Sequence, residues 1–585
     1  MLFLGALNPA PLSAAIPLAA DVKDVARKDT LIVSGFTPGP SEIVDPQNMN
    51  PYSLGGLGRV RDILNKTIFE FLYLYNHDTG EQIPWLASGY TSAPDGMSVD
   101  VTLRDGVEWS DGQPFTSDDV KYTIELLRDS PALVFAADMK EWVKDVTVVD
   151  AQHFTINLNK PQVRFFYYYF VENSEIHLPI LPKHIWQSQD PATFSNFNLS
   201  AGWPVGTGPY TLVDASGQAQ MFDRNDNWWG ARTGFQQLPR PLRVIFQQPG
   251  AVDAAAARMI NNEFDIGATM EPGVFEAARA RNPNIVSWNT QGPAWGAADG
   301  CVYILGLNTR WGPTANVHVR RAIEHAIDRQ RLVDLAWEGA TVPLVVPFST
   351  YGGLEAYESQ MTSVISKYNP DNPDPSQVAS EMQAAGYAKD AGGFWAKDGT
   401  RLTMDLLTPG FAKSMGPTVE RQLRDNGFDV TFKLFDPDVS PFLDIVRAGN
   451  ASIWNMVHCG SSAEPWGTLQ HFHSRFASPA QGQQNSYVTA NSQYMNPEFD
   501  AIIDQMDPMI PSPSDPTYVA LAIQATELFL RDIPEIVLAD HRSVVTFNNT
   551  YWRGWMSASD PYAASASLWA ATELALLKVQ PAPGQ

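Results

Sequence analysis

The chain has 585 residues, of which 44% are hydrophobic and 18% are charged, so it can bury a large core and is not a disordered polymer. Its 40 basic residues against 64 acidic ones give a net charge of -24, which disfavours binding to nucleic acid or to anionic lipid surfaces. Only Cys301 and Cys459 occur, which excludes a multi-disulfide framework and leaves open either one long-range bridge or two buried thiols.

The N-terminal stretch MLFLGALNPAPLSAAIPLAA is similar to the remnant of a secretory signal. It is apolar and ends in small residues before Asp21, although no basic segment precedes it. We therefore expect residues 1–27 to be a signal-like, flexible N-terminus with cleavage near Ala19 or Ala20. Export of this kind is typical of a bacterial periplasmic or extracellular protein, and we expect no lipid anchor because no cysteine lies near the cleavage site.

The segment from 99 to 127 predicts a strand, two turns and a capped helix. Val99, Val101 and Leu103 alternate with polar residues as in a half-buried strand, and the sequences RDG and SDG then turn the chain. Thr116 followed three residues later by Asp119 is the signature of a helix N-terminus. Local backbone hydrogen bonding explains these carboxylates, so we interpret the segment as scaffold rather than as a catalytic site.

Strands and helices are mixed through the rest of the chain. WPVGTGPYTLV (203–213) predicts a sharp turn before a strand, and apolar residues at helical spacing predict one amphipathic helix over 316–337. Strand-like segments at 401–410 and 429–436 flank a helical segment at 416–428, which predicts a β-α-β crossover with parallel strands. This mixture indicates an α/β protein built of large lobes.

Motifs of enzymes and metal sites are missing from the sequence. There is no GxSxG, HExxH, EF-hand loop, CxxC pair or phosphate-binding glycine loop ahead of a helix. His458, Cys459, His471 and His473 come nearest to a metal site, but their spacing matches no recognised one, and we interpret them as exposed or internally bonded residues. We expect no cofactor, no metal and no enzymatic activity. A secreted glycan hydrolase, with a carboxylate pair that meets only in the folded chain, remains a rival interpretation.

Four blocks of sequence, in this order, resemble the family 5 extracellular solute-binding proteins. These proteins are the capture components of ABC importers for oligopeptides, dipeptides, nickel and some oligosaccharides. The blocks are LRDGVEWSDGQPFTSDDVKYTIELL, PVGTGPYTLV with RNDNWWG, LGLNTRWGPTANVHVRRAIEHAIDRQRLV, and PEIVLADHRSVV.

The resemblance implies an α/β, two-lobed periplasmic-binding-protein clamp of type II, with an extra domain inserted in the first lobe. The implied parts are the first lobe at 28–55, 202–300 and 534–585, the inserted domain at 56–201, and the second lobe at 301–533. Such a clamp closes around a small-molecule solute and presents it to the membrane permease of the importer. The resemblance also implies a monomer that hydrolyses no ATP itself.

The same resemblance bears on the solute. In peptide-binding members an aspartate a few positions before an acidic-Pro pair holds the α-amino group of the ligand. Here the pair is Glu464 and Pro465, and counting back places Ser461 where that aspartate would be. A buried ammonium without a counter-charge is costly, so an oligosaccharide or related polyhydroxylated solute is favoured. An oligopeptide or dipeptide stays the alternative.

The predicted ligand contacts combine flat indole rings with small polar side chains, which suit the faces and the hydroxyls of sugars. They are Asn48, Asn50, Tyr52, Trp295, Trp454, His458, Ser461, Ser462 and Trp466. Core packing is the competing interpretation for the tryptophans, and turn formation for the residues of the early loop.

Overall fold

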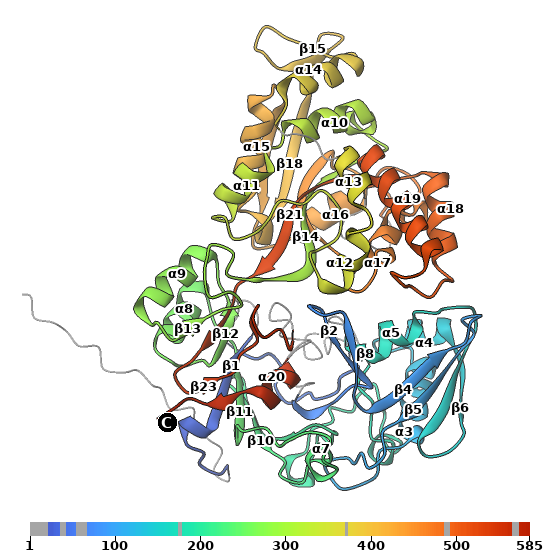
Figure 1. Cartoon of the computed structure of the whole chain (residues 1–585), viewed down its shortest axis with the longest axis vertical. Coiled ribbons are helices and arrows are strands. Elements are labelled where there is room, and N and C mark those ends of the chain that lie inside the picture. The colour runs from blue at the N-terminus through green and yellow to red at the C-terminus, as the bar shows by residue number, and fades with distance from the viewer. Residues whose placement is uncertain are drawn as a thin grey trace, which may run out of the picture.

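The computed structural model describes residues 22–35, 42–53, 67–172, 178–368, 373–484, 492–563 and 572–584. The expected signal segment up to Asp21, its cleavage site and the boundary at 55/56 lie outside the described residues. Figure 1 shows one α/β body above two others: the second lobe at the top, the first lobe at the lower left and the inserted domain at the lower right.

The first lobe is built on a seven-stranded sheet of order β13-β22-β12-β1-β11-β10-β9. Its strands are β1 (Thr30–Ser34), β9 (Tyr210–Ala215), β10 (Gln220–Arg224), β11 (Arg243–Gln247), β12 (Ile266–Thr269), β13 (Ile285–Val286) and β22 (Val545–Asn548). Strand β1 pairs in parallel with both β11 and β12, and helices α8 (Val252–Ile260) and α9 (Pro272–Arg281) lie beside this sheet. Three distant parts of the chain therefore form one sheet.

The second lobe is built on a five-stranded sheet of order β19-β18-β20-β14-β21. Its strands are β14 (Ala297–Leu307), β18 (Thr403–Pro409), β19 (Asp429–Phe435), β20 (Ile453–Cys459) and β21 (Glu535–Ser543). Its helices include α12 (Gly352–Glu358), α13 (Thr362–Tyr368), α14 (Pro375–Ala384), α16 (Ser440–Arg447), α17 (Trp466–Leu469), α18 (Pro497–Met506) and α19 (Pro516–Asp532). The predicted crossover is confirmed, because β18 and β19 pair in parallel and α15 (Gly416–Asp425) connects them.

The helix predicted over 316–337 is in fact two helices, α10 (Val317–Ala326) and α11 (Arg329–Ala336). Ile327 adopts an extended conformation, and the Asp328 side chain then accepts a hydrogen bond from the Arg331 amide at 2.8 Å. An aspartate in this position satisfies an amide at a new helix start, so it divides a continuous apolar pattern.

The inserted domain contains a four-stranded sheet and a small three-stranded sheet. The strands are β2 (Tyr73–Asn76), β3 (Glu81–Pro84), β4 (Ala87–Ser92), β5 (Ser98–Leu103), β6 (Val143–Val148), β7 (His153–Leu158) and β8 (Val171–Glu172). The helices are α3 (Ser117–Asp129), α4 (Ala136–Trp142), α5 (Phe165–Phe170) and α6 (Lys183–Trp186). The predicted strand, turns and capped helix are confirmed: the Thr116 amide donates to Asp119 Oδ2 at 2.9 Å, completing a capping box at the start of α3.

The inserted domain shares its apolar core with the first lobe. Trp228 and Trp229, at the start of α7 (Trp229–Arg232), are buried in the core of the inserted domain. Leu574 and Leu577 of the C-terminal helix α20 (Thr572–Lys578) pack on the same core, while its Leu576 lies in the core of the first lobe. These contacts join the inserted domain and the first lobe into one unit.

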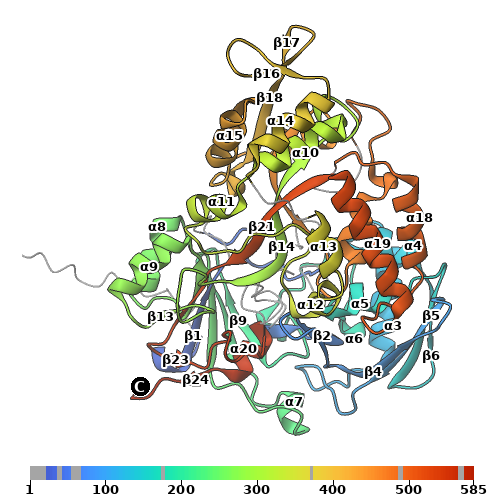
Figure 2. The ribbon, with the colours of Figure 1, turned by 45° about the horizontal axis from the view of Figure 1, so that its top comes forward.

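Two strands carry the chain between the lobes. Strand β14 pairs with β21 from Ala297 opposite Ser543 to Gly306 opposite Glu535, and Figure 2 shows the two strands side by side between the lobes. The structure differs here from the expected boundary at 533/534, because β21 belongs to the sheet of the second lobe. The return to the first lobe comes only with β22.

Within the described ranges, no helix combines the length and the apolar character needed to cross a lipid bilayer.

Candidate functional site

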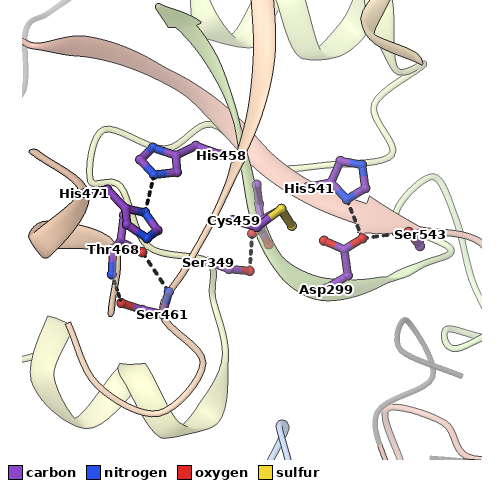
Figure 3. The surroundings of a disulfide bond; sticks show 11 residues. Asp299, Ser349, His458, Cys459, Ser461, Thr468, His471, His541 and Ser543 are labelled. Atoms are coloured by element: carbon purple, nitrogen blue, oxygen red, sulfur yellow. Dashed lines mark hydrogen bonds and ion pairs between the residues drawn. A yellow bond between two sulfur atoms is a disulfide. The ribbon is translucent and has the colours of Figure 1, made fainter. Parts of the chain in front are cut away.

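The second lobe turns the ends of β14, β20 and β21 toward the first lobe, and a disulfide lies at these ends (Figure 3). Cys301 of β14 is directly opposite Cys459 of β20, and the bridge joins Cα atoms 4.1 Å apart. Cys459 is exposed and Cys301 partly exposed. Of the two possibilities that the sequence left open, the structure has the bridge.

An aspartate and a histidine form a pair beside the disulfide (Figure 3). His541 Nδ1 lies 2.5 Å from Asp299 Oδ2, and the Ser543 hydroxyl donates to the same oxygen at 3.0 Å. Burial disfavours the charged imidazolium, but the Asp299 carboxylate outweighs this effect and raises the pKa of His541. The histidine therefore compensates the charge of the aspartate, which is itself only 6% exposed.

A second carboxylate on this face, Asp540, is held by its neighbours. It accepts hydrogen bonds from Ser349 Oγ at 2.8 Å, Thr350 Oγ1 at 2.6 Å and Arg542 Nε at 3.2 Å. Burial raises the pKa of Asp540. Its role is to fix the loop that precedes α12 against strand β21.

His458 and His471 form a buried chain with Glu535. His458 Nδ1 lies 2.9 Å from Glu535 Oε1, and His458 Nε2 lies 3.0 Å from His471 Nδ1. Burial, together with the neighbouring His458, lowers the pKa of His471 to about 3, so this imidazole stays neutral. In the part of the chain that the structure describes, no three His, Cys, Asp or Glu side chains are grouped to hold a metal ion. The hydrogen bonds of His458 and His471 fit their interpretation as internally bonded residues.

A pocket with a volume of about 310 Å³ lies where the inserted domain meets the second lobe. Its lining combines tyrosines with small and charged residues, and it includes Tyr75, Arg164, Tyr167, Gly352, Tyr357 and Glu464. Ser462, a predicted ligand contact, lies at this junction: its hydroxyl is 2.8 Å from the Tyr167 hydroxyl, and its carbonyl accepts from the Tyr75 hydroxyl at 3.3 Å.

Two further predicted contacts, Ser461 and Trp466, lie next to this junction but serve the local fold. The Ser461 hydroxyl donates to the Pro465 carbonyl at 3.0 Å and accepts from the Thr468 amide at 2.8 Å. Trp466 is 5% exposed, and its indole N–H donates to the Ile503 carbonyl at 3.3 Å. Ser461 thus forms a turn, and it brings no negative charge to this position.

Asn48, Asn50 and Tyr52, three further predicted contacts, form hydrogen bonds within the protein. Asn50 donates to the Pro191 and Phe194 carbonyls, each at 2.9 Å, and the buried Tyr52 donates to the Pro179 carbonyl. The half-buried Asn48 accepts from the Asn50 amide at 3.2 Å, which is turn formation.

Trp295 and Trp454 lie in two separate apolar cores. Trp295 donates to Glu276 Oε1 at 3.0 Å, and Trp454 is 1% exposed on strand β20. Core packing accounts for both rings in this arrangement, and their contact with a solute stays a prediction.

Sequence reasoning missed Asp299, His541 and Arg164. The first two lie in the stretches GAADG and ADHRSVV, and they meet only because β14 pairs with β21. Arg164 lies 300 residues from its carboxylate partner Glu464. No local sequence signal predicts either contact.

Comparison with known proteins gives a consistent result. Residues 81–479 match the model of the bacterial extracellular solute-binding proteins, family 5 (middle). The nickel-binding periplasmic protein of Escherichia coli is 26% identical over 418 residues, which are 69% of this chain and 72% of that protein.

Solved structures show the fold. A periplasmic oligopeptide-binding protein of Thermotoga maritima superposes with a TM-score of 0.78 and 23% identity, covering 95% of this chain and 99% of the other. The mannohexaose-bound form gives a TM-score of 0.72 and 22% identity, over 95% and 99% of the two chains. The two-lobed α/β periplasmic-binding fold predicted from the sequence is confirmed.

Proposed function

We propose that this chain, which belongs to family 5 of the bacterial extracellular solute-binding proteins, captures an elongated, uncharged polar solute between its lobes and delivers it to a membrane permease. Members of the family are the non-enzymatic substrate-binding proteins of ABC importers, and they act in the periplasm or outside the cell. The proposal concerns the finer points: the class of solute, and its capture as a monomer by lobe closure.

The charge of the candidate site supports an uncharged solute. Ser461 stands where peptide-binding members are expected to carry an aspartate, and its hydroxyl is engaged in a turn. Two carboxylates nearby are already paired, Asp299 with His541 and Glu464 with Arg164. An incoming ammonium would lose its hydration and find no carboxylate at position 461, which is unfavourable in a buried site. An oligosaccharide or related polyhydroxylated solute avoids this penalty.

The preference for a sugar over a peptide rests on one observation, the absence of a carboxylate at position 461. The Thermotoga maritima structure with bound mannohexaose gives independent support, since that protein has the same fold. The same Thermotoga maritima protein is also described as oligopeptide-binding, so a peptide remains the alternative to be tested.

The connection of the two lobes through two strands is compatible with closure of the lobes around a solute. A solute that contacts both lobes stabilises only the arrangement in which they are close, and its differential affinity shifts the population toward that state. No covalent step is required of any residue, so the solute would be released unchanged.

Isothermal titration calorimetry with the purified protein tests the class of solute. Manno-, cello- and galacto-oligosaccharides of two to six units would be compared with uncharged and charged tri- to pentapeptides. We expect at least one oligosaccharide to bind with one-to-one stoichiometry and the peptides to give no heat. Tight binding of a peptide with no binding of any sugar would contradict the proposal.

A further inference from the structure

We propose that Arg164 is a latch that holds the inserted domain against the second lobe before any solute binds. This inference rests on the proposed function only in treating the two lobes as movable parts. It concerns a different matter, namely how much of the closed arrangement the protein stabilises by itself.

Arg164 belongs to the inserted domain, where it immediately precedes α5, yet its guanidinium group is buried in the second lobe. Its side chain is 2% exposed, and that of its partner Glu464 is 8% exposed. The second lobe satisfies the guanidinium through Glu464 Oε1 at 2.9 Å, the Asp507 carbonyl at 2.6 Å, the Met506 carbonyl at 3.3 Å and the Tyr518 hydroxyl at 3.1 Å. A planar cation with several donors is well suited to such a set of acceptors.

The second lobe provides a complete socket for this cation. The ring of Trp466 lies 4.4 Å from the guanidinium carbon, which is a cation–π contact. The other oxygen of Glu464 accepts from the Trp466 amide at 2.7 Å and from the Tyr518 hydroxyl. These bonds orient the carboxylate before Arg164 arrives, so the socket is formed by residues of the second lobe alone.

The interface around Arg164, between the inserted domain and the second lobe, has features of an interface whose two sides can separate. Among the described residues, the apolar clusters of the two bodies reach across this junction only through the partly buried Tyr168 and Ala463. The direct contacts include the hydroxyl pair of Tyr167 and Ser462 and a ring contact between His77 and Tyr351, whose centroids lie 5.0 Å apart. The pocket of about 310 Å³ leaves the interface incompletely packed. By contrast, Trp228 and Trp229 of the first lobe lie in the core of the inserted domain, and Leu574 packs against the cores of both parts.

A second contact between the inserted domain and the second lobe lies beside Arg164, and it requires two backbone segments to approach closely. The turn between β2 and β3 lies against the start of α12, in the region that Figure 2 shows below α13. A Cβ atom on Gly352 would come within 1.8 Å of the Asp78 carbonyl oxygen. Gly352 therefore allows the turn to pack against the second lobe while Arg164 is bound to Glu464.

A latch of this kind changes the affinity for the solute. When the binding-competent state is only partly populated, the apparent dissociation constant rises by the inverse of that population. Contacts supplied by Arg164 raise the population of the closed state without solute, so less of the solute's own binding free energy is needed for closure.

Small-angle X-ray scattering of the solute-free protein tests the latch directly. We compare the wild type with Arg164→Ala and Glu464→Gln, which remove the cation and the counter-charge respectively. Arg104→Ala is the matched control, because Arg104 lies in the inserted domain but donates to the Trp85 carbonyl at 2.7 Å and stacks on Phe235, away from the second lobe. Circular dichroism and the thermal midpoint of each variant establish that it is folded.

The wild type and Arg104→Ala should scatter as the closed arrangement. Arg164→Ala and Glu464→Gln should show a larger radius of gyration, with the closed-to-open ratio lowered by about tenfold or more. If both folded variants scatter like the wild type, or if the solute-free wild type is already open, the latch does not exist. Because no solute is used, these outcomes leave the result of the calorimetric panel unaffected, and the two proposals fail separately.

Discussion

Glu70 is a buried carboxyl whose environment has consequences for stability. It is 1% exposed and accepts indole N–H bonds from Trp85 at 2.9 Å and from Trp229 at 2.7 Å. Burial is the largest influence and raises its pKa from 4.5 to about 7, although these hydrogen bonds oppose the shift. The residue joins the inserted domain to α7 of the first lobe, so its protonation affects the unit that these two parts form.

The sign of the pH effect follows from the raised pKa. The folded chain holds a proton on Glu70 that the unfolded chain has lost, so stability falls as pH rises from about 4.5 to about 7. We expect Glu70→Gln to have a smaller drop in thermal midpoint between about pH 5 and about pH 8 than the wild type. An equal drop in both proteins would show that Glu70 does not contribute.

Single residues are also where sequence reasoning reached its limit. A tryptophan that contacts a sugar and one that fills a core have the same sequence signature, and the structure places Trp454 and Trp295 in cores. Glu464 could be singled out as half of an acidic-Pro pair, but its partner Arg164 could not, because the contact depends on how two separate bodies meet. Charge pairing across such a distance in sequence leaves no local pattern.

At the scale of elements, the break between α10 and α11 depends on one N-cap. Asp328→Ala removes the acceptor of the Arg331 amide and should lower the unfolding free energy by about 1 kcal/mol. Asp334→Ala is the control, because Asp334 is exposed on α11 and its side chain accepts from the Gln330 side chain at 2.9 Å rather than from a backbone amide at the helix start. Thermal unfolding followed by circular dichroism should rank Asp328→Ala below the control; equal midpoints would argue against the cap.

We expect the turn between β2 and β3 to make closure depend on pH. Burial raises the pKa of Asp78 to about 7, and its backbone lies against Gly352 of the second lobe. If opening exposes Asp78, its pKa returns toward 3.8, so the closed arrangement binds the proton more tightly and is favoured below about pH 7.

The expected observation is a radius of gyration of the solute-free protein that increases from about pH 5 to about pH 8. Asp78→Asn cannot titrate and should show a flatter profile. Asp95→Asn, in an exposed turn of the same domain, should keep the wild-type slope. A variant at Asp78 with the full wild-type slope would assign the pH dependence to another group.

Local elements were the most predictable part of the fold. The capped helix α3 and the β18-α15-β19 crossover follow from apolar periodicity and capping, which act over short distances in sequence. The single helix expected over 316–337 was wrong because periodicity continues through Asp328, whereas backbone hydrogen bonding does not.

For the whole molecule, the order of four sequence blocks predicted two lobes with an inserted domain. Three separate chain segments do form the first sheet. The position of the second crossing was not predictable, since β21 and β22 follow each other directly and both are largely buried. Their pairing assigns them to different lobes: β21 pairs with β14 in one sheet, and β22 pairs with β12 and β13 in the other.

The central claim is that this protein holds a polar solute between its lobes and leaves it chemically intact. Native mass spectrometry after overnight incubation with mannohexaose and the other oligosaccharides of the panel tests it most directly. We predict a one-to-one complex with at least one of them, whose mass is that of the protein plus the unaltered sugar. A complex or a released product that contains a shortened sugar, or no complex with any oligosaccharide, would contradict the account.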